Sequence, residues 1–446
     1  MIKKIKNRLY IRPICLIYRT KIKQIKYQGE QMRLLGLMLL FMGVAHAELS
    51  NSELERRIDI LSEEITSLKA YQMNITKNQQ AYGLSPSASK VYFIPQGLSI
   101  GGYGEIFYNH KSAENQDGDP VDNDPTVEAY RYVIYLGYKF NDKWVLNTEI
   151  ELEHVSEIFN EFMYLDYLHD PTLNFRFGLM LLPVGFINEQ HEPVLFPSVR
   201  RPEVERLIIP STWREIGVGT FGSIGNIDYK AYIVNGGDAD DITTSNFRGT
   251  RKKGGDGGDS DNTNASTGAA VVRLDYNVDT QTSFGASIYK GQGSSDNSEN
   301  LETTLYDLHA QYQYKGLRLR VLYTELNYDN VDDWNDVNNG TNSNGNAQTN
   351  LQSKLQGGYI EALYNVWQGK KVAALEPFVR YERVNLNADY NEDDYTYDGA
   401  KDRHSYRVGL AYKPTVRITF KADYAFIENK ADNAVNEFNL GMGFNF

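Results

Sequence analysis

The stretch Trp144–Glu153, WVLNTEIELE, alternates between two kinds of side chain. Successive side chains of a β-strand point to opposite faces, so a period of two predicts a strand with one apolar and one polar face. The apolar face carries Trp144, Leu146, Ile150 and Leu152, and the polar face carries Asn147, Glu149, Glu151 and Glu153. A strand of about ten residues is long enough to cross the apolar core of a membrane at a tilt.

The same alternation recurs from Gly97 to the end of the chain. It predicts sixteen strands, which begin near residues 97, 127, 143, 157, 172, 215, 226, 268, 281, 302, 317, 354, 373, 403, 416 and 434. We therefore expect an all-β fold, a 16-stranded antiparallel transmembrane β-barrel over residues 97–446. The 32 tyrosines and the low mean hydropathy suit a barrel, in which only every second residue faces lipid. Composition alone leaves a soluble all-β protein open.

The connections between the strands are sorted by length. Those after even-numbered strands are tight, at 141–142, 170–171, 225–226, 315–316, 368–371 and 413–415. Those after odd-numbered strands include nearly all the long ones, at 110–126, 182–214, 236–267, 328–353 and 386–402. Outer-membrane barrels have short periplasmic turns and long extracellular loops. A soluble β-sandwich gives no reason for this sorting, so the connections favour the membrane barrel.

The last predicted strand ends on an aromatic residue, Phe446. Its apolar positions alternate with polar or small ones and are Phe438, Leu440, Met442, Phe444 and Phe446. A terminal aromatic on such a strand resembles the recognition sequence of barrel proteins that are inserted into bacterial outer membranes. A plain edge strand is the alternative interpretation.

The N-terminal region has the pattern of an export sequence. Basic Arg33 is followed by an apolar run at 34–44 and by Ala45-His46-Ala47, which predicts a signal peptide that ends at residue 47. Residues 1–31 are a basic extension that adds nothing to this pattern, as if the chain started at Met32. Without the ten Lys/Arg and one acid of 1–47, the remainder holds 36 basic and 57 acidic residues, a charge of −21, which disfavours nucleic acid as a partner. The single cysteine, Cys15, precedes the cleavage site, so no disulfide or thiolate site is expected.

Residues 48–80 carry a heptad pattern. Leucine or isoleucine stands at 54, 61, 68 and 75, with Ile58 and Ile65 between them. Helices with such a narrow apolar stripe associate, so the pattern predicts a short α-helical coiled coil in the periplasm. A single amphipathic helix packed on the rest of the chain is the alternative. Isoleucine at a and leucine at d favours dimers, and residues 81–96, which contain serine and proline, are expected to form a linker.

The connection 182–214, the third on the side of the long connections, contains five prolines, four glutamates and four arginines. Proline removes backbone donors, so no regular ladder can run through it. The segment is nevertheless apolar enough to pack, and we expect it to fold into the barrel and narrow the pore. The charged residues expected at this constriction are Glu189, His191, Glu192, Arg200, Arg201, Glu203, Glu205, Arg206 and Arg214. The alternative is an external loop at a trimer interface.

Sixteen strands leave a water-filled lumen, so inward residues are expected to line a channel. The alternation assigns to this pore wall Arg131, Arg176, Arg273, Arg318, Arg320, Arg380, Arg407, Arg417, Lys421, Glu149 and Glu151. Most of these charges are expected to solvate the wall and pair with one another. Selectivity requires a narrow point at which charges act on every passing ion.

Several segments resemble the phosphate-selective porin O and P family of outer-membrane porins. They are LSIGGYGEIFY (98–108), FGLMLLPVGFINEQHEP (177–193), RRPEVERLIIPSTWREIGVG (200–219) and YKAYIVNG (229–236). The predicted coiled coil resembles that of DcaP-like trimeric porins. The resemblance implies a homotrimer of sixteen-stranded barrels whose third loop enters the pore, and passive uptake of small anions. The balance of four Glu against four Arg in 182–214 leaves a phosphate-specific channel as the minority alternative.

The predicted function is that of an outer-membrane porin for small hydrophilic solutes and ions, embedded in outer-membrane lipid. An outer-membrane enzyme is disfavoured because the seven histidines are dispersed and no Ser–His pair with an orienting partner is evident. Neither a cofactor nor a metal is expected, since the Asp/Gly clusters of the long loops lack the spacing of a known calcium loop. A barrel with an adhesive or envelope-tethering role is the third class of function.

Overall fold

The computed structural model describes residues 80–236, 266–293, 301–338, 351–367, 373–389 and 397–446, together with Arg57. The chain divides into two compact units, Met1–Thr76 and Lys77–Phe446, and the second is described here. The predicted signal peptide and nearly all of the predicted coiled coil lie outside the described residues.

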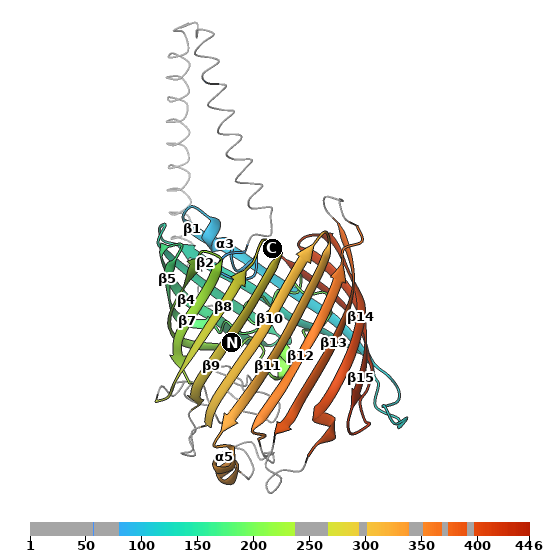
Figure 1. The fold of residues 1–446 in the computed structure, drawn as a ribbon. Helices are drawn as coiled ribbons and strands as arrows, with labels where there is room; N and C mark the ends of the chain where they lie inside the picture. The colour runs from blue at the N-terminus through green and yellow to red at the C-terminus, as the bar shows by residue number, and fades with distance from the viewer. Residues whose placement is uncertain are drawn as a thin grey trace, which may run out of the picture. The chain divides into compact units, whose positions relative to one another are not determined.

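Sixteen antiparallel strands close into a barrel (Figure 1). Each strand pairs with its neighbours in sequence, and β1 pairs with β16, with Tyr103 opposite Asn445. The strands are β1 (Gly97–Lys111), β2 (Thr126–Lys139), β3 (Trp144–Glu153), β4 (Glu157–Asp170), β5 (Leu173–Leu181), β6 (Arg214–Ile224), β7 (Ile227–Asn235), β8 (Gly268–Asn277), β9 (Thr282–Gly293), β10 (Leu301–Tyr314), β11 (Leu317–Asp329), β12 (Lys354–Tyr364), β13 (Ala374–Asp389), β14 (Asp402–Thr415), β15 (Ile418–Asn429) and β16 (Glu437–Asn445). The predicted fold class and strand number are confirmed.

The two ends of the barrel differ in their connections. Turns such as Gly225-Asn226 and Lys315-Gly316 gather at one end, which we call the short-turn end and which is uppermost in Figure 1. The start of β1 and the end of β16 lie there too. The opposite, long-loop end carries α5 (Val331–Asn338). No helix in the described part of the chain is both long and apolar enough to span a membrane.

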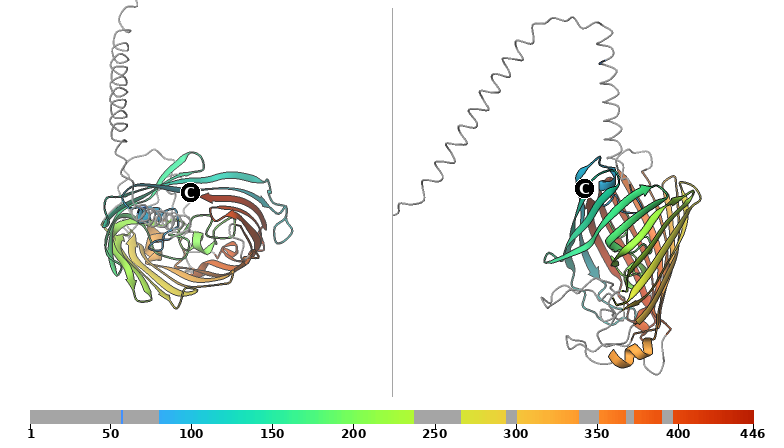
Figure 2. Two further views of the ribbon diagram at one scale, coloured as in Figure 1. Left: turned by 90° about the horizontal axis from the view of Figure 1, so that it is seen from above. Right: turned by 90° about the vertical axis from the view of Figure 1, so that its left-hand side faces the viewer.

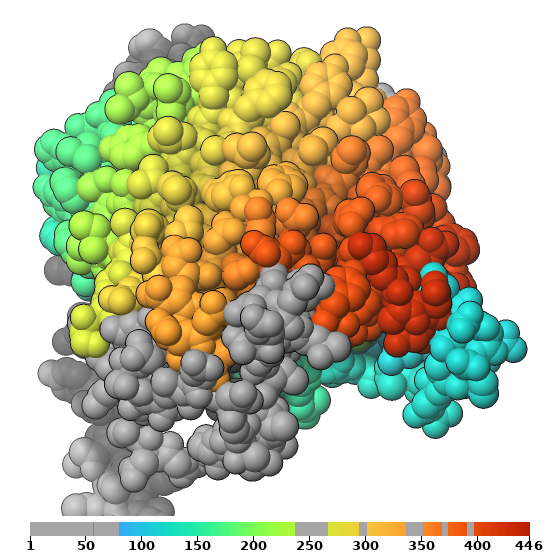
Figure 3. Space-filling view, turned by 60° about the horizontal axis from the view of Figure 1, so that its bottom comes forward, coloured from blue at the N-terminus to red at the C-terminus, as the bar shows by residue number. Residues whose placement is uncertain are grey.

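The strand faces separate apolar from charged side chains. In β3 the odd-numbered side chains point inward and are buried, and Glu149 and Glu151 are 0% and 2% exposed. Outward residues elsewhere are apolar and exposed, and Figure 3 shows this outer surface between β8 (yellow) and β15 (red). Examples are Leu98, Val127, Ile158, Ile233 and Ile360, each more than half exposed. This arrangement is inside out relative to a soluble protein and matches a wall that faces lipid.

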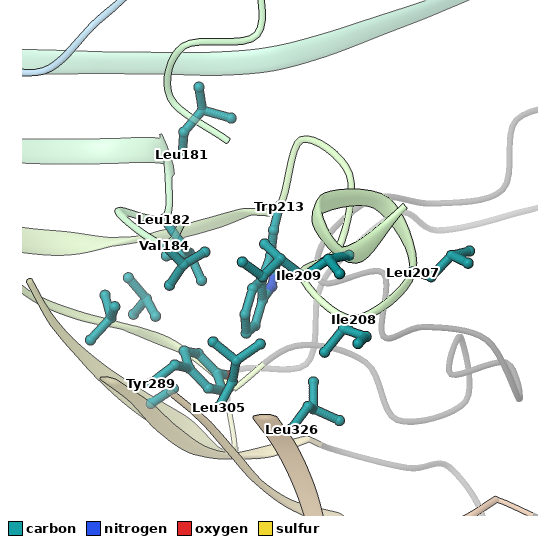
Figure 4. Packing of buried hydrophobic residues seen from close by; sticks show 14 of the residues in the cluster. Leu181, Leu182, Val184, Leu207, Ile208, Ile209, Trp213, Tyr289, Leu305 and Leu326 are labelled. Atoms are coloured by element: carbon teal, nitrogen blue, oxygen red, sulfur yellow. The ribbon is translucent and has the colours of Figure 1, made fainter. Parts of the chain in front are cut away.

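The interior contains an apolar core as well as charges. Residues 182–213, which join β5 to β6, lie inside the ring of strands (Figure 2, left). Leu182, Val184, Ile208, Ile209 and Trp213 pack with inward residues of β9–β11 (Figure 4). The partners on the wall are Tyr289, Leu305, Leu322 and Leu326. The hydrophobic effect therefore holds the loop inside the barrel.

Residues 80–93, including α3 (Lys90–Phe93), also pack inside the barrel near the short-turn end. The side chain of Asn147 donates a hydrogen bond to the Ala88 carbonyl over 2.9 Å, and the Tyr92 hydroxyl donates to Asp166 over 2.7 Å. Val91 occupies the space above Gly137, where a Cβ would lie 2.6 Å from it. The segment that the sequence presents as a linker is thus a packed element, because its small residues fit between the loop and the wall.

Candidate pore constriction

The loop begins with a turn that only glycine adopts without strain. Gly185 has φ of +63° and donates its N–H to the Asp307 carboxylate over 3.0 Å, while its carbonyl accepts from Arg273. A Cβ at Gly185 would lie 2.7 Å from Glu205 Oε2 and 2.8 Å from Ile209 Cδ1. Wall charges from β8 and β10 therefore hold the start of the loop in one place.

Glu205 organises the same turn from within the loop. Its Oε2 accepts from the N–H groups of Phe186 (2.8 Å) and Ile187 (2.5 Å), and its Oε1 accepts from the Tyr359 hydroxyl of β12 (2.6 Å). Burial raises the pKa of Glu205, which is 2% exposed. This predicted constriction residue is therefore part of the loop's support and is buried rather than exposed in the lumen.

Glu189 and His191 contact the wall formed by β3 and β7. Glu189 Oε2 lies 2.5 Å from Lys230 Nζ. The Nδ1–H of His191 donates to the Asn188 carbonyl (2.8 Å), and Nε2 lies 2.9 Å from Glu149 Oε1. A carbonyl oxygen can only accept a hydrogen bond, so Nδ1 carries a proton. In the second contact, Nε2 of the ring and the carboxyl group of Glu149 then share one proton. Burial lowers the pKa of His191 to about 3, so the imidazole is neutral at neutral pH.

Glu192 joins the loop to residues 80–93. Its Oε1 accepts from the backbone N–H groups of Ser87 (2.7 Å) and Ala88 (3.4 Å), and its Oε2 accepts from Asn445 of β16 (2.6 Å). Burial raises the pKa of Glu192 to about 7. One carboxylate thus connects three parts of the chain that are far apart in sequence.

The other half of the loop contacts β13–β16. The Val199 N–H donates to Asp423 (2.6 Å), and the Ser198 carbonyl accepts from Lys421 (2.9 Å). The Val204 N–H, at the start of α4 (Val204–Leu207), donates to Glu382 over 2.7 Å. Glu203 pairs with Arg403 at 2.8 Å. The loop therefore reaches from one wall of the barrel to the other.

Most predicted wall charges are paired with one another. Arg131 binds Glu105 (2.6 Å) and lies 3.6 Å from Glu151, and Arg176 binds Asp166 (2.8 Å). Further pairs are Arg380–Glu361 (3.2 Å), Arg273–Asp275 (2.7 Å) and Arg407–Asp423.

Four residues predicted for the constriction or the pore wall do not take part in these ion pairs between wall residues or lie outside the predicted segment. Arg214 belongs to β6 rather than to the loop and pairs with Glu161 at 3.0 Å. Arg417 lies in the turn between β14 and β15, because β15 begins two residues later than the sequence predicted. Arg320 donates to Gln311 (2.8 Å), and its guanidinium lies 5.1 Å from the centre of the Phe186 ring. Arg318 and Arg320 both line the larger of the two cavities described next.

Cavities lie on both sides of the loop. The cavity on the short-turn side measures about 660 Å³ and is lined by charges of both signs, among them Lys230, Arg273, Arg318, Arg320, Glu189 and Asp275. The cavity on the long-loop side measures about 250 Å³ and is lined by Arg200, Arg201 and Arg206, with Glu105 and Glu128. The two cavities share no lining residue, and residues of the loop line both of them.

Sequence reasoning missed Asp307 and His309 of β10, which support the loop. His309 Nδ1 lies 2.5 Å from Asp307, and its Nε2 lies 2.8 Å from Asp275. The alternation along β10 is the signal that could have placed both residues inward. One segment, GLSIG at 97–101, has the G-x-S-x-G spacing of hydrolase nucleophiles. Ser99, however, lies within β1, whereas that motif requires a strand-to-helix turn.

Comparisons with known proteins agree with the fold. No protein-family model matches the chain. The structure of Salmonella typhi OmpF in complex with daunomycin has a TM-score of 0.54 at 12% identity, covering 79% of this chain and 98% of OmpF. A loop L8 deletion mutant of OmpT, an outer membrane protein of Vibrio cholerae, has a TM-score of 0.50 at 13% identity, covering 78% of this chain and all of OmpT. At these identities the likeness concerns the fold alone.

Sequence similarity extends to a protein of Aquifex aeolicus described only as uncharacterized. The two chains are 32% identical over 368 residues, which is 79% of this chain and 81% of the other. The chain therefore belongs to the same family as this Aquifex aeolicus protein, and it folds as a closed sixteen-stranded barrel of the kind found in bacterial outer-membrane proteins.

Proposed function

We propose that the protein is an outer-membrane porin, a channel for passive diffusion of small hydrophilic solutes and ions. The observation that carries this proposal is a closed barrel with an apolar exterior and with charged cavities on both sides of an internal loop. An apolar wall of this kind is stable only in lipid, and sixteen strands enclose a lumen that side chains alone do not fill.

The export pattern of residues 1–47 supports placement of the barrel in the outer membrane of a Gram-negative bacterium. The short turns, the start of β1 and the end of β16 then face the periplasm, where residues 48–80 would form the coiled coil. We propose a homotrimer, because the heptad pattern calls for self-association and the resemblance to trimeric porins favours three copies. Chemical crosslinking of the purified protein tests this number, and a crosslinked dimer alone would contradict it.

Selectivity is proposed to arise at the loop and the facing wall. The loop brings arginines to the long-loop side, while Lys230 and Arg273 lie opposite Glu189 and Asp275 on the short-turn side. Charges of both signs favour a general porin, and the arginines make a phosphate- or anion-specific channel the alternative. We propose no catalytic role.

The test is the conductance of purified protein in a planar bilayer under a KCl gradient. We expect discrete channels, and the reversal potential reports whether anions or cations are preferred. Added phosphate that blocks the current would favour the phosphate-specific alternative, and no effect of phosphate would favour the general porin.

A tethering or adhesive barrel is the second candidate. The observation in its favour is that the loop and residues 80–93 both fill the lumen and leave two separate cavities. Correctly folded protein without conductance in the same bilayer experiment would support this role and exclude the porin.

A further inference from the structure

The smaller cavity, on the long-loop side of the loop, combines arginines with aromatic rings. It lies between strands β1 and β2 and residues 196–211 of the loop and measures about 250 Å³. Arg200, Arg201 and Arg206 line it from the loop. Phe107, Tyr130 and Phe196 supply aromatic surface from three different elements. The cavity therefore offers positive charge and apolar contact within one small volume.

Two of these arginines carry buried donors without a partner among the described residues. Arg201 is 7% exposed, and its Nη1 donates to Ser211 (2.9 Å) and Thr212 (3.4 Å). Its Nη2 and the Nε of Arg200 are buried, and neither has a hydrogen-bond acceptor. A buried charged donor without an acceptor is costly, so these groups favour an incoming anion.

The acidic residues that line or adjoin the cavity already contact other side chains. Glu105 accepts from Arg131 over 2.6 Å, and Glu128 contacts the ring of His154. Glu203, which lies 3.5 Å from Arg206, also pairs with Arg403. The positive charge of Arg200 and Arg201 is therefore left for a ligand.

The structure holds the two arginines in position before any ligand arrives. The Ser198 hydroxyl donates to the Arg200 carbonyl over 2.7 Å, and the neighbouring Val199 N–H is bound to Asp423. The Arg200 guanidinium lies 4.7 Å from the centre of the Phe107 ring, a cation–π contact. A preorganised site loses little entropy when it binds.

We propose that this cavity binds a small organic anion with an apolar body, whose carboxylate is bound by Arg200 and Arg201. The apolar body lies against Phe107, Tyr130 and Phe196. Known ligand pockets measure roughly 300–1,000 Å³. The volume of this cavity, about 250 Å³, lies just below that range and suits a ligand body of about one ring. The proposal names a solute class for the channel proposed above and rests on that function, although binding itself requires no conduction.

Calorimetric titration of the folded full-length protein in detergent tests the proposal with four probes. Benzoate carries both features, benzyl alcohol lacks the charge, and acetate and inorganic phosphate lack the apolar body. We expect benzoate to bind at least about tenfold more tightly than each of the other three. Equal affinity for benzoate and phosphate would overturn the proposal, and so would equal affinity for benzoate and benzyl alcohol. This comparison needs no substitution.

Two variants locate the site. The double substitution Arg200→Gln and Arg201→Gln is expected to weaken benzoate binding at least about tenfold. The matched control is Arg383→Gln. Arg383 lies in the half of β13 nearer the long-loop end, and its side chain points outward and is 53% exposed. The control should bind benzoate like the parent protein, and a double variant that does so as well would refute the assignment. Benzoate binding by protein that shows no conductance would uphold this site and contradict the porin, so the two failures are distinguishable.

Discussion

The carboxylate of Glu192 accepts a hydrogen bond from the backbone N–H of Ser87 over 2.7 Å, across 105 positions of sequence. The contact places residues 80–93 against the loop that crosses the barrel. The N-terminal segment and the loop both occupy the lumen, and this contact joins them there.

Glu192→Ala should release residues 80–93 from the loop. Residues 48–446 contain no cysteine, so in the mature protein that the export pattern predicts Ser87→Cys provides a unique thiol in the buried segment. Loss of hydrogen bonds to a charged acceptor, worth about 1.5–3 kcal/mol each, should raise its labelling by a water-soluble maleimide at least about tenfold. Asp117→Cys, in an exposed loop, is the control and should label equally in both backgrounds. Unchanged labelling of Ser87→Cys would contradict a holding role for Glu192.

The stability of the barrel should depend on pH through Glu192. Its pKa of about 7 in the folded state exceeds the ordinary value of 4.5, so the folded protein binds the extra proton between these values. The stabilisation is complete below pH 4.5 and is lost as the pH rises through about 7, with a slope of at most about 1.4 kcal/mol per pH unit. Urea unfolding of the parent protein and Glu192→Gln at several pH values isolates this difference.

His191 should have the opposite effect to Glu192 on the pH dependence of stability, over an overlapping range of pH. Its pKa of about 3 in the folded state lies below the ordinary 6.5, so the unfolded chain binds more protons between these values and stability rises with pH. Glu192→Gln should therefore show stability that increases from pH 4 to pH 6.5, and adding His191→Gln should remove the increase. An increase that persists in the double variant would assign it to another group.

Gly185→Ala should destabilise the protein by roughly 1–3 kcal/mol, from backbone strain at positive φ and from the close approach to Glu205. Gly225→Ala is a matched control, since Gly225 has φ of +62° but nothing within 4 Å of an added Cβ. Gly225→Ala should lower the free energy of unfolding only by the backbone strain, about 1 kcal/mol. The free energy of unfolding in urea compares the two, and equal losses would show that contact with Glu205 is unimportant.

Lys230→Met should shift ion selectivity toward cations, because it leaves the Glu189 carboxylate uncompensated at the larger cavity. A unit charge at about 4 Å contributes about 1 kcal/mol in water, which corresponds to roughly a fivefold change in the permeability ratio. Reversal potentials in a KCl gradient measure the shift. Adding Glu189→Gln should restore the original potential, and failure to do so would indicate that the pair does not face the ion path.

The strands and their closure were predictable because alternation with a period of two is a local property. The pattern of β3, and its recurrence in the other strands, required no knowledge of what each strand contacts. The prolines and apolar residues of 182–214 likewise excluded a regular ladder and required a surface against which to pack.

The sequence alone thus determined the barrel, which face of a strand most side chains occupy, and the unusual character of residues 182–214. Only the tertiary structure decided which inward charges meet. Glu205 and Tyr359, or Glu192 and Asn445, are each a loop residue and a wall residue far apart in sequence, and their contact depends on how the loop packs across the lumen. Periodicity states which face a residue occupies but not what lies opposite, and for that reason Arg200 and Arg201 could be placed in the loop but not in a cavity beside Phe107.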